Sequence, residues 1–354
     1  MKINRLLLTA IAGALFFASC SSDDDSGRVS GAYDNGVIVL NEGGYNSGNA
    51  SASFIFNGSQ VENNIFSGVN SGKLLGDTAQ SIGFHDDLAF IVLNVSNKIE
   101  VVNRYTFKNV ATIDADLSSP RYIEFENGKA YVTNWGNGGV ATDDYVAVID
   151  LNTYTVTAKI PVGEGPEKLV EEDNKLYVAH KGGYNQGSTI SVINLNNNTV
   201  ETVINVGDVP AGIDVEDNKL YVLSQGRPSY AAPETAGKLE VISLDNNTVI
   251  KTFNFSGLTH PDKFDMENNR IYYTVGRSVY SMPLNADTLP ETPLFTLDNW
   301  GVLYGFAVED NRIYIADAAS NYTAAGRAYI YSLSGSLQET VTVGVNPNGF
   351  YFND

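Results

Sequence analysis

The sequence predicts an all-β fold, a seven-bladed β-propeller built from four-stranded blades. One strand pattern recurs seven times at intervals of 41–52 residues, and the two ends of the chain are complementary fragments of a single repeat. A period of 40–50 residues is typical of propeller blades. We expect the propeller to fill residues 34–354 as one domain, after a signal peptide at 1–19 and a lipidated, acidic tether at 20–33.

The segment before the predicted propeller has the pattern of an export signal. A short basic start is followed by an apolar stretch at 6–17, which is too short to span a bilayer but suits a signal peptide. Residues 17–20 then resemble the lipobox of bacterial lipoproteins, with Cys20, the only cysteine, as the lipidated residue. The Ser/Asp run at 21–27 is an unstructured tether that resembles the surface-export signal of Bacteroidetes lipoproteins. The alternatives are an ordinary signal peptide with a stray cysteine, or a plain linker to the inner leaflet.

Aromatic residues mark the repeated strand. These anchors are Phe90, Tyr131, Tyr177, Tyr221, Tyr272 and Tyr314, and residues 36–39 form a weaker seventh copy. The unit at 211–254 shows four expected strands, at 211–215, 219–224, 238–243 and 248–253. Alternating apolar residues indicate strands, and Asp/Asn clusters between them suit hairpin turns with positive φ. We expect the anchors to pack in the core, and we expect no helix after the signal peptide.

The C-terminus supplies the strand that the N-terminal repeat lacks. Residues 343–352 repeat the pattern of 206–215, which precedes an aromatic strand elsewhere. The first repeat, however, begins near Gly36 with its aromatic-type second strand. We therefore expect the C-terminal strand to pair with the N-terminal blade and close the ring.

Composition excludes several classes of function. Acidic residues outnumber basic residues 41 to 22, a formal net charge of −19, which argues against nucleic acid and anionic lipid as partners. One cysteine and three histidines leave little material for disulfides or metal sites. The sequence has no G-x-S-x-G, H-E-x-x-H or calcium-loop motif. We therefore expect no catalytic site, no bound metal and no cofactor.

The predicted strand order divides the loops between two faces. Turns between first and second strands, and between third and fourth strands, are short, polar and nearly interchangeable. The loops between second and third strands, and the crossings between blades, are long and carry both tryptophans and several tyrosines. Exposed aromatic rings beside polar groups are typical of a binding surface. We place the ligand site on this side, the long-loop face.

The candidate ligand-binding residues all belong to these loops and crossings. They are Tyr45, Arg121, Asn134, Trp135, His180, Tyr184, Arg227, Tyr230, His260, Trp300, Tyr304 and Tyr322. The crossings also carry Gln80, Glu167, Lys168, Asp262 and Lys263.

Several of these residues have two open interpretations. Arg121 is expected either to line the central channel or to form an ion pair between blades. His180 could point into the pocket, and His260 is expected either to ligate cobalt or a catalytic metal or to hydrogen-bond the backbone. Glu167 and Lys168 are expected to form, at most, a weak surface pair. Replacing Trp135 and Tyr184 together is expected to abolish binding with little change in the melting temperature.

Several motifs resemble a known group of propellers. The runs at 146–156 and 160–166 are similar to YncE-type seven-bladed propellers, and residues 40–45 and 132–136 are similar to the Bacteroidetes surface-lipoprotein branch of that group. That branch includes BtuG-type proteins, which capture corrinoids. The resemblance covers nearly all of the chain after the signal peptide. It implies a surface-exposed outer-membrane lipoprotein that captures cobalamin or a related corrinoid and passes it to a TonB-dependent barrel.

Two other functions stay open on the sequence. The first is a protein- or glycan-interaction scaffold, which would use a broad contact surface and show no response to small molecules. The second is a lactonase- or quinoprotein-like enzyme. A lactonase would need convergent oxygen ligands around a metal, and Asn134, Glu167 and Asp262 are the residues it could recruit.

Overall fold

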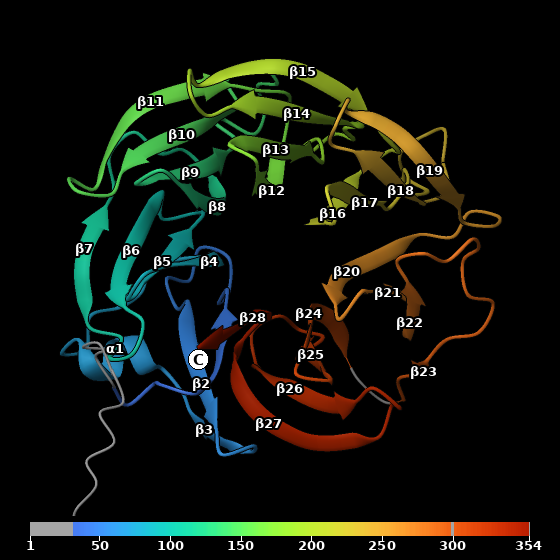
Figure 1. Ribbon diagram of the computed structural model, residues 1–354. Helices are drawn as coiled ribbons and strands as arrows, with labels where there is room; N and C mark the ends of the chain where they lie inside the picture. The colour runs from blue at the N-terminus through green and yellow to red at the C-terminus, as the bar shows by residue number, and fades with distance from the viewer. Residues whose placement is uncertain (1–30, 299–300, 354) are drawn as a thin grey trace, which may run out of the picture.

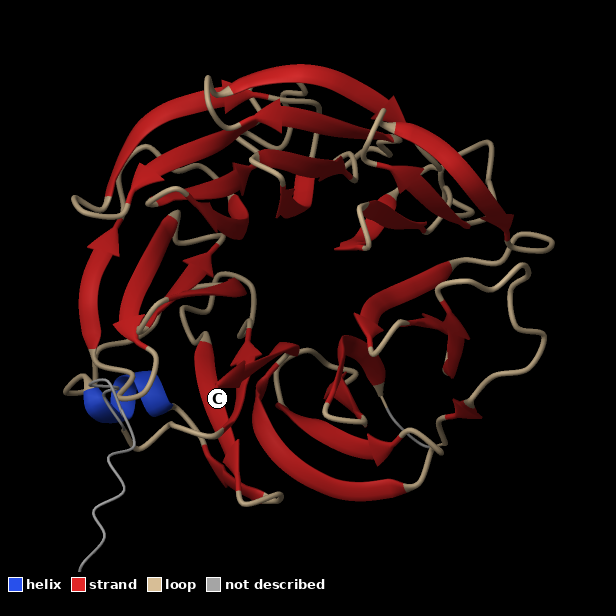
Figure 2. Ribbon diagram, in the orientation of Figure 1, coloured by secondary structure: helices blue, strands red, loops and turns tan. Residues whose placement is uncertain are grey.

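The seven-bladed fold is confirmed. The computed structural model describes residues 31–298 and 301–353. Their strands form seven four-stranded antiparallel sheets, arranged as blades around a central axis (Figure 1 and Figure 2). The predicted signal peptide, most of the tether including Cys20, and Trp300 lie outside the described residues.

The blades follow one another along the chain, and within each blade the strands run in order from the innermost to the outermost. Blade 1 holds β28 (Pro347–Asn353), β1 (Gly36–Asn41), β2 (Ser51–Phe56) and β3 (Gln60–Glu62). Blade 2 holds β4 (Ala79–His85), β5 (Leu88–Leu93), β6 (Lys98–Asn103) and β7 (Asn109–Ile113). Blade 3 holds β8 (Pro120–Glu126), β9 (Lys129–Asn134), β10 (Tyr145–Asp150) and β11 (Thr155–Pro161). Blade 4 holds β12 (Pro166–Glu172), β13 (Lys175–His180), β14 (Thr189–Asn194) and β15 (Thr199–Asn205).

The remaining three blades have the same layout. Blade 5 holds β16 (Pro210–Glu216), β17 (Lys219–Ser224), β18 (Lys238–Ser243) and β19 (Thr248–Asn254). Blade 6 holds β20 (Pro261–Glu267), β21 (Arg270–Val275), β22 (Ser278–Pro283) and the very short β23 (Phe295–Thr296). Blade 7 holds β24 (Val302–Glu309), β25 (Arg312–Ala318), β26 (Ala325–Ser332) and β27 (Leu337–Val345). The four strands expected at 211–254 therefore match β16–β19 to within one residue.

The short turns use the left-handed backbone that their Asp/Asn sequences favour. Asp173 and Asn174, between β12 and β13, have φ of 51° and 60°, and Asp217 and Asn218 have 51° and 55°. Two consecutive positive φ values are the signature of the type I′ turn, whose twist matches that of the flanking strands. The predicted hairpin turns are confirmed.

One helix corrects the expectation that there would be none. Helix α1 spans Ile65–Val69, in the crossing from blade 1 to blade 2. Ile65 and Phe66 are buried and join the apolar cluster between these two blades. A helix of five residues is too short to display a 3.6-residue period, so the sequence pattern could not reveal it.

The core is divided into apolar clusters that lie between neighbouring blades. Tyr177 of β13, for example, packs with Leu220 and Val222 of the next blade. The other aromatic anchors sit in the corresponding clusters, and each anchor is at most 4% exposed. Burying such a side chain contributes about 1.5–3 kcal/mol to stability. The repeated aromatic position thus joins blade to blade, as predicted.

The ring closes as the chain ends predict. Strand β28 is the innermost strand of blade 1 and pairs antiparallel with β1, from Gly36 opposite Asn353 to Asn41 opposite Pro347. Figure 1 shows the red C-terminal strand beside the blue strands of blade 1. Phe350 of β28 also packs on Tyr314 of blade 7, with ring centroids 5.5 Å apart. One strand therefore ties together the first and last blades.

Candidate functional site

A β-bulge at the start of each innermost strand positions the site. In β12, Pro166 pairs with His180 and Leu169 with Val178, so two residues oppose one on the partner strand. The same irregularity recurs in the other six innermost strands. A bulge redirects its side chains out of the regular pleat. The bulged residues are Gln80, Arg121, Tyr122, Glu167, Lys168, Ala211, Asp262, Lys263, Tyr304 and Asn348.

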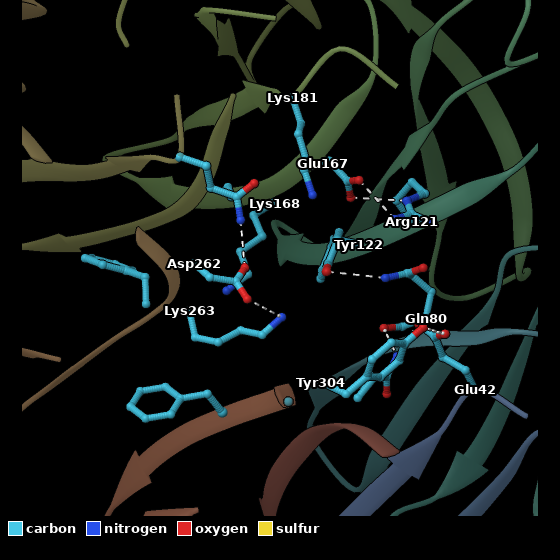
Figure 3. A pocket seen from close by; sticks show the side chains of 16 residues that line it. Glu42, Gln80, Arg121, Tyr122, Glu167, Lys168, Lys181, Asp262, Lys263 and Tyr304 are labelled. Carbon is cyan, nitrogen blue, oxygen red and sulfur yellow. Dashed lines mark hydrogen bonds and ion pairs between the residues drawn. The ribbon is translucent and has the colours of Figure 1, made fainter. Parts of the chain in front are cut away.

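These bulged residues converge on one cavity of about 260 Å³ at the mouth of the central channel. We call it the polar cavity, and Figure 3 shows its charged side chains directed toward one another. Three residues from the long loops also line it, Glu42, Lys181 and Gln225, and Phe264, Gly305 and Phe306 of the innermost strands complete its wall. All seven blades contribute to it, so the cavity exists only in the closed ring.

An ion pair between blades 3 and 4 forms one wall of the polar cavity. Arg121 donates to Glu167 from Nε at 3.1 Å and from Nη2 at 2.9 Å. Burial lowers the pKa of Arg121, but the Glu167 carboxylate more than offsets this and the pKa is raised overall. The guanidinium also lies 4.2 Å from the ring of Trp135. Both interpretations of Arg121 therefore apply, because it lines the cavity and forms an ion pair between blades. The expected surface pair between Glu167 and Lys168 is wrong, because Glu167 is buried and bonded to Arg121.

A second wall comes from blades 7 and 1. The Tyr304 hydroxyl donates to Glu42 at 2.6 Å, and the Asn348 amide donates to the same carboxylate at 3.2 Å. Burial raises the pKa of Glu42, although these two hydrogen bonds partly oppose the shift. Glu42 therefore holds its proton more readily than an exposed glutamate. Opposite this wall, Asp262 accepts a hydrogen bond from Gln225 at 2.7 Å and lies 3.4 Å from the Lys263 ammonium.

A second cavity, of about 480 Å³, adjoins the first. The two share the lining residues Lys181, Gln225 and Asp262. Tyr184 and Tyr230 line the second cavity and are 75% and 86% exposed, so we call it the aromatic cavity. It lies between the β13–β14 and β17–β18 loops, whose lengths and compositions differ from those of the other blades.

His260 lines the aromatic cavity with both ring nitrogens engaged. Nδ1 lies 2.9 Å from the Gln225 carbonyl oxygen, and Nε2 lies 3.0 Å from the Glu234 carboxylate. These bonds hold the ring against the β17–β18 loop. A metal or ligand atom would have to displace one of them.

Trp135 is partly buried and ties blade 3 to blade 4. Its indole Nε1 donates to the Pro166 carbonyl oxygen at 3.1 Å, its face stacks on Arg121, and Tyr184 meets it edge-on with centroids 6.0 Å apart. Removing Trp135 would therefore reduce stability. These contacts argue against the expectation that replacing Trp135 and Tyr184 together leaves the melting temperature nearly unchanged.

Three candidate residues line neither cavity. Asn134 is fully buried, donates to the Val132 carbonyl oxygen at 2.8 Å and accepts from the Ser118 N–H at 3.0 Å. His180 is 2% exposed, and its Nδ1 lies 2.8 Å from the Thr189 hydroxyl. Arg227 forms an ion pair with Asp208, at 3.2 Å. All three side chains support loops of the face instead of lining its cavities.

Tyr45 and Tyr322 lie on the long-loop face outside the linings of both cavities. Tyr45 is 74% exposed on the β1–β2 loop. Tyr322 is 45% exposed and meets Tyr304 edge-on, with centroids 6.2 Å apart. Of the twelve candidates, the structure therefore brings Arg121 and Tyr304 to the polar cavity, and Tyr184, Tyr230 and His260 to the aromatic cavity.

Sequence reasoning missed several residues of the polar cavity. Glu42, Lys181, Gln225 and Asn348 were not singled out. A usable signal was present for Asn348, because it directly follows the proline that begins its innermost strand, as Arg121 and Glu167 do. Aligning the repeats on that proline gives the bulged positions directly.

Within residues 31–298 and 301–353, no three His, Cys, Asp or Glu side chains are grouped so that they could hold a metal ion. In the same residues, no helix has the length and apolar character needed to cross a membrane.

A family model described as "Domain of unknown function (DUF5074)" matches residues 35–353. The chain belongs to this family. No curated protein matches the sequence. The matched region of the DUF5074 chain covers the propeller from the first residues before β1 to the end of β28.

Solved structures that resemble the DUF5074 chain share its fold. Hydrazine synthase from Kuenenia stuttgartiensis is 16% identical, with a TM-score of 0.61 over 78% of this chain and 92% of that one. A functionally unknown protein from Desulfotomaculum acetoxidans is 11% identical, with a TM-score of 0.65 over 90% and 98%. BamB from Moraxella catarrhalis is 13% identical, with a TM-score of 0.52 over 92% and 88%. At these identities the likeness concerns the fold alone.

Proposed function

We propose that this protein is a lipoprotein, anchored through Cys20 on the cell surface, that captures a corrinoid such as cobalamin and delivers it to a TonB-dependent outer-membrane barrel. The observation that supports capture best is the pair of joined cavities on the long-loop face, one polar and one walled by exposed tyrosines. Pockets that combine apolar rings with a few convergent polar groups are typical ligand sites. The choice of a corrinoid comes from the sequence resemblance.

The chemistry of the two cavities suits a large ligand with many amide groups. The polar cavity offers donors such as Gln80 and acceptors such as Asp262, and amides need both. Tyr184 and Tyr230 offer flat apolar surface with hydroxyl tips. Cavities of about 260 and 480 Å³ are too small to enclose a whole corrinoid. The ligand would lie across the open face and insert its substituents into them.

Co-elution from a sizing column tests the proposal. Residues 28–354 are mixed with cyanocobalamin, and the red ligand is expected to elute with micromolar protein. The Tyr184→Ala/Tyr230→Ala variant is expected to bind at least tenfold more weakly, because both exposed rings line the aromatic cavity. Tyr45→Ala is the matched control, since Tyr45 is equally exposed but lines neither cavity.

Clean separation of wild-type protein from cyanocobalamin would exclude a tight corrinoid binder. Equal binding by wild type and the Tyr184/Tyr230 variant would remove the aromatic cavity from the proposal. We expect the Tyr184/Tyr230 variant to fold like the wild type, because both rings are exposed and their removal leaves the core unchanged. A loss of binding would then report on the cavity.

A further inference from the structure

Two lysines in the polar cavity form no ion pair within the described part of the chain. Lys168 is the second bulged residue of β12, and Lys181 directly follows β13. Figure 3 shows both side chains directed into the cavity. Among the described residues, neither ammonium group forms an ion pair or a hydrogen bond with a side chain. Ammonium groups inside a protein are normally paired, so these two are available to a ligand.

The other charges of the polar cavity are already balanced or engaged. Arg121 is paired with Glu167, and Lys263 is paired with Asp262. Glu42 accepts hydrogen bonds from two neutral donors, and burial raises the pKa of its carboxyl group. Four basic and three acidic side chains line the cavity, so it holds one more basic than acidic group, and the two lysines are its basic groups without an ion pair among the described residues.

Burial lowers the pKa of Lys168, and the nearby carboxyl groups of Asp265 and Asp214 offset this shift only in part. Asp265 uses its oxygens to accept from the Val308 N–H at 2.7 Å and the Met266 N–H at 2.8 Å. Burial raises the pKa of Asp265 to about 7, so at neutral pH it is only partly ionised. Asp214, whose pKa burial also raises, accepts from the Val215 N–H at 2.8 Å. Neither carboxylate forms an ion pair with Lys168 within the described chain.

The positive cavity contrasts with the protein as a whole. The chain has a formal net charge of −19, and a surface of that sign repels small anions in general. Four of its cations nevertheless line this one cavity: Arg121, Lys168, Lys181 and Lys263. An anion that binds this protein must therefore bind at a local site, and the polar cavity has the charge, the donors and the concave shape for it.

We infer that the polar cavity binds an anionic group of the captured ligand, a phosphate or a carboxylate, between the ammonium groups of Lys168 and Lys181. The inference deepens the proposed function, since it concerns the same ligand site. It does not depend on the ligand being a corrinoid. Gln80 and Gln225 also line the cavity, from blades 2 and 5, and each amide group has a second N–H, beside the one bonded to Tyr122 or Asp262, that can complete the shell of hydrogen bonds around such a group.

Titration with simple anions tests the inference without any corrinoid. Inorganic phosphate is titrated into residues 28–354 and followed by the phosphorus NMR linewidth, and acetate is followed by its proton signal, at constant ionic strength. Lys168→Met and Lys181→Met are each expected to weaken binding at least tenfold, because each removes one of two unpaired cations. Lys159→Met is the matched control, since Lys159 lies on the outermost strand β11 and pairs with Asp116.

Binding of either anion that depends on both lysines and not on Lys159 would support the inference. Phosphate would indicate a phosphoryl group in the ligand and acetate a carboxylate. No binding of either anion by wild type, or equal binding by wild type and both Met variants, would overturn it. Lys168→Arg, which keeps the charge, should retain binding. If anions bind and cyanocobalamin does not, the corrinoid proposal fails while the anion site stands.

Discussion

At the scale of single residues, two candidates that do not line the cavities, Asn134 and His180, occupy the last position of the second strand of their blades. Asn41, Asn134 and His180 occupy this position in blades 1, 3 and 4, and all three are buried. Asn41 and Asn134 each donate to the carbonyl oxygen two residues earlier. The position therefore supports the start of a long loop. Comparing Asn134 and His180 with the residues at the same position in the other repeats would have indicated this structural role from the sequence.

His180 makes the stability of the protein depend on pH. Burial lowers the pKa of its imidazole from 6.5 to about 4. Above pH 6.5 both folded and unfolded chains hold it neutral. As the pH falls from 6.5 toward 4, the unfolded chain takes up a proton that the folded chain refuses, so the free energy of unfolding decreases. The loss approaches about 3 kcal/mol at full extent.

The His180→Asn variant, which introduces the asparagine that blades 1 and 3 carry at this position, isolates this effect. Both proteins are unfolded with urea at about pH 7.5 and about pH 4.5. Between these two pH values, the free energy of unfolding of the wild type should fall by about 2 kcal/mol relative to that of the variant. Burial raises the pKa of Asp144, Glu124 and Asp265, which gives the opposite pH trend. Those groups are common to both proteins and cancel in the comparison. Parallel pH profiles would contradict the assignment.

At the scale of elements, a crossing between blades supports the loop that carries Lys181 and Tyr184. Gly165, directly before β12, has φ of 65°, and its carbonyl oxygen accepts the Lys181 N–H at 2.9 Å. A Cβ atom at this position would lie 1.8 Å from the backbone nitrogen of Gly183. Only glycine allows the crossing and the loop to approach this closely.

Gly165→Ala should therefore destabilise the protein by about 3 kcal/mol or more, because a backbone segment must move. It should also weaken ligand binding by displacing the loop. Gly48→Ala is the matched control, with φ of 61° and no atom within 4 Å of the added Cβ. That control should cost only about 1–2 kcal/mol, the usual penalty of a left-handed alanine. Equal losses in urea unfolding would show that the close approach is unimportant.

The elements differ in how far the sequence predicts them. The strands of blade 5 were placed to within one residue, because alternation and Asp/Asn turns are local signals. Helix α1 was missed because five residues show no period. The bulges were also missed, since a bulge is defined by pairing with another strand and leaves no pattern in composition. For this reason Tyr122 and Asn348 were not recognised as site residues.

At the scale of the whole molecule, ring closure creates the site. The period of the repeat and the complementary chain ends were enough to predict seven blades and the role of the last strand. The polar cavity could not be predicted in the same way, because its lining comes from all seven innermost strands. Neighbours such as Glu42 and Asn348 are far apart in sequence and meet only when β28 joins β1.

Removing β28 should therefore cost both stability and binding. A chain that ends at Asn346 loses all pairing to the inner edge of β1, the Phe350–Tyr314 contact and Asn348 of the cavity. We expect calorimetry to show loss of the single cooperative transition or a large fall in melting temperature. A circular permutant that links residue 353 to residue 35 and opens the chain at 320–323 is the control, and it should melt like wild type. An unchanged melting temperature in the truncated chain would show that closure is dispensable.

Capture of a corrinoid on the long-loop face is tested most directly by locating cobalt. Crystals of residues 28–354 grown with saturating cyanocobalamin would give an anomalous difference peak at the metal, independent of any fitted ligand. We predict one peak over the aromatic cavity, beside Tyr184 and Tyr230, with ligand density entering the polar cavity toward Lys168 and Lys181. A peak on the face of the short turns, or no peak at saturating ligand, would contradict this.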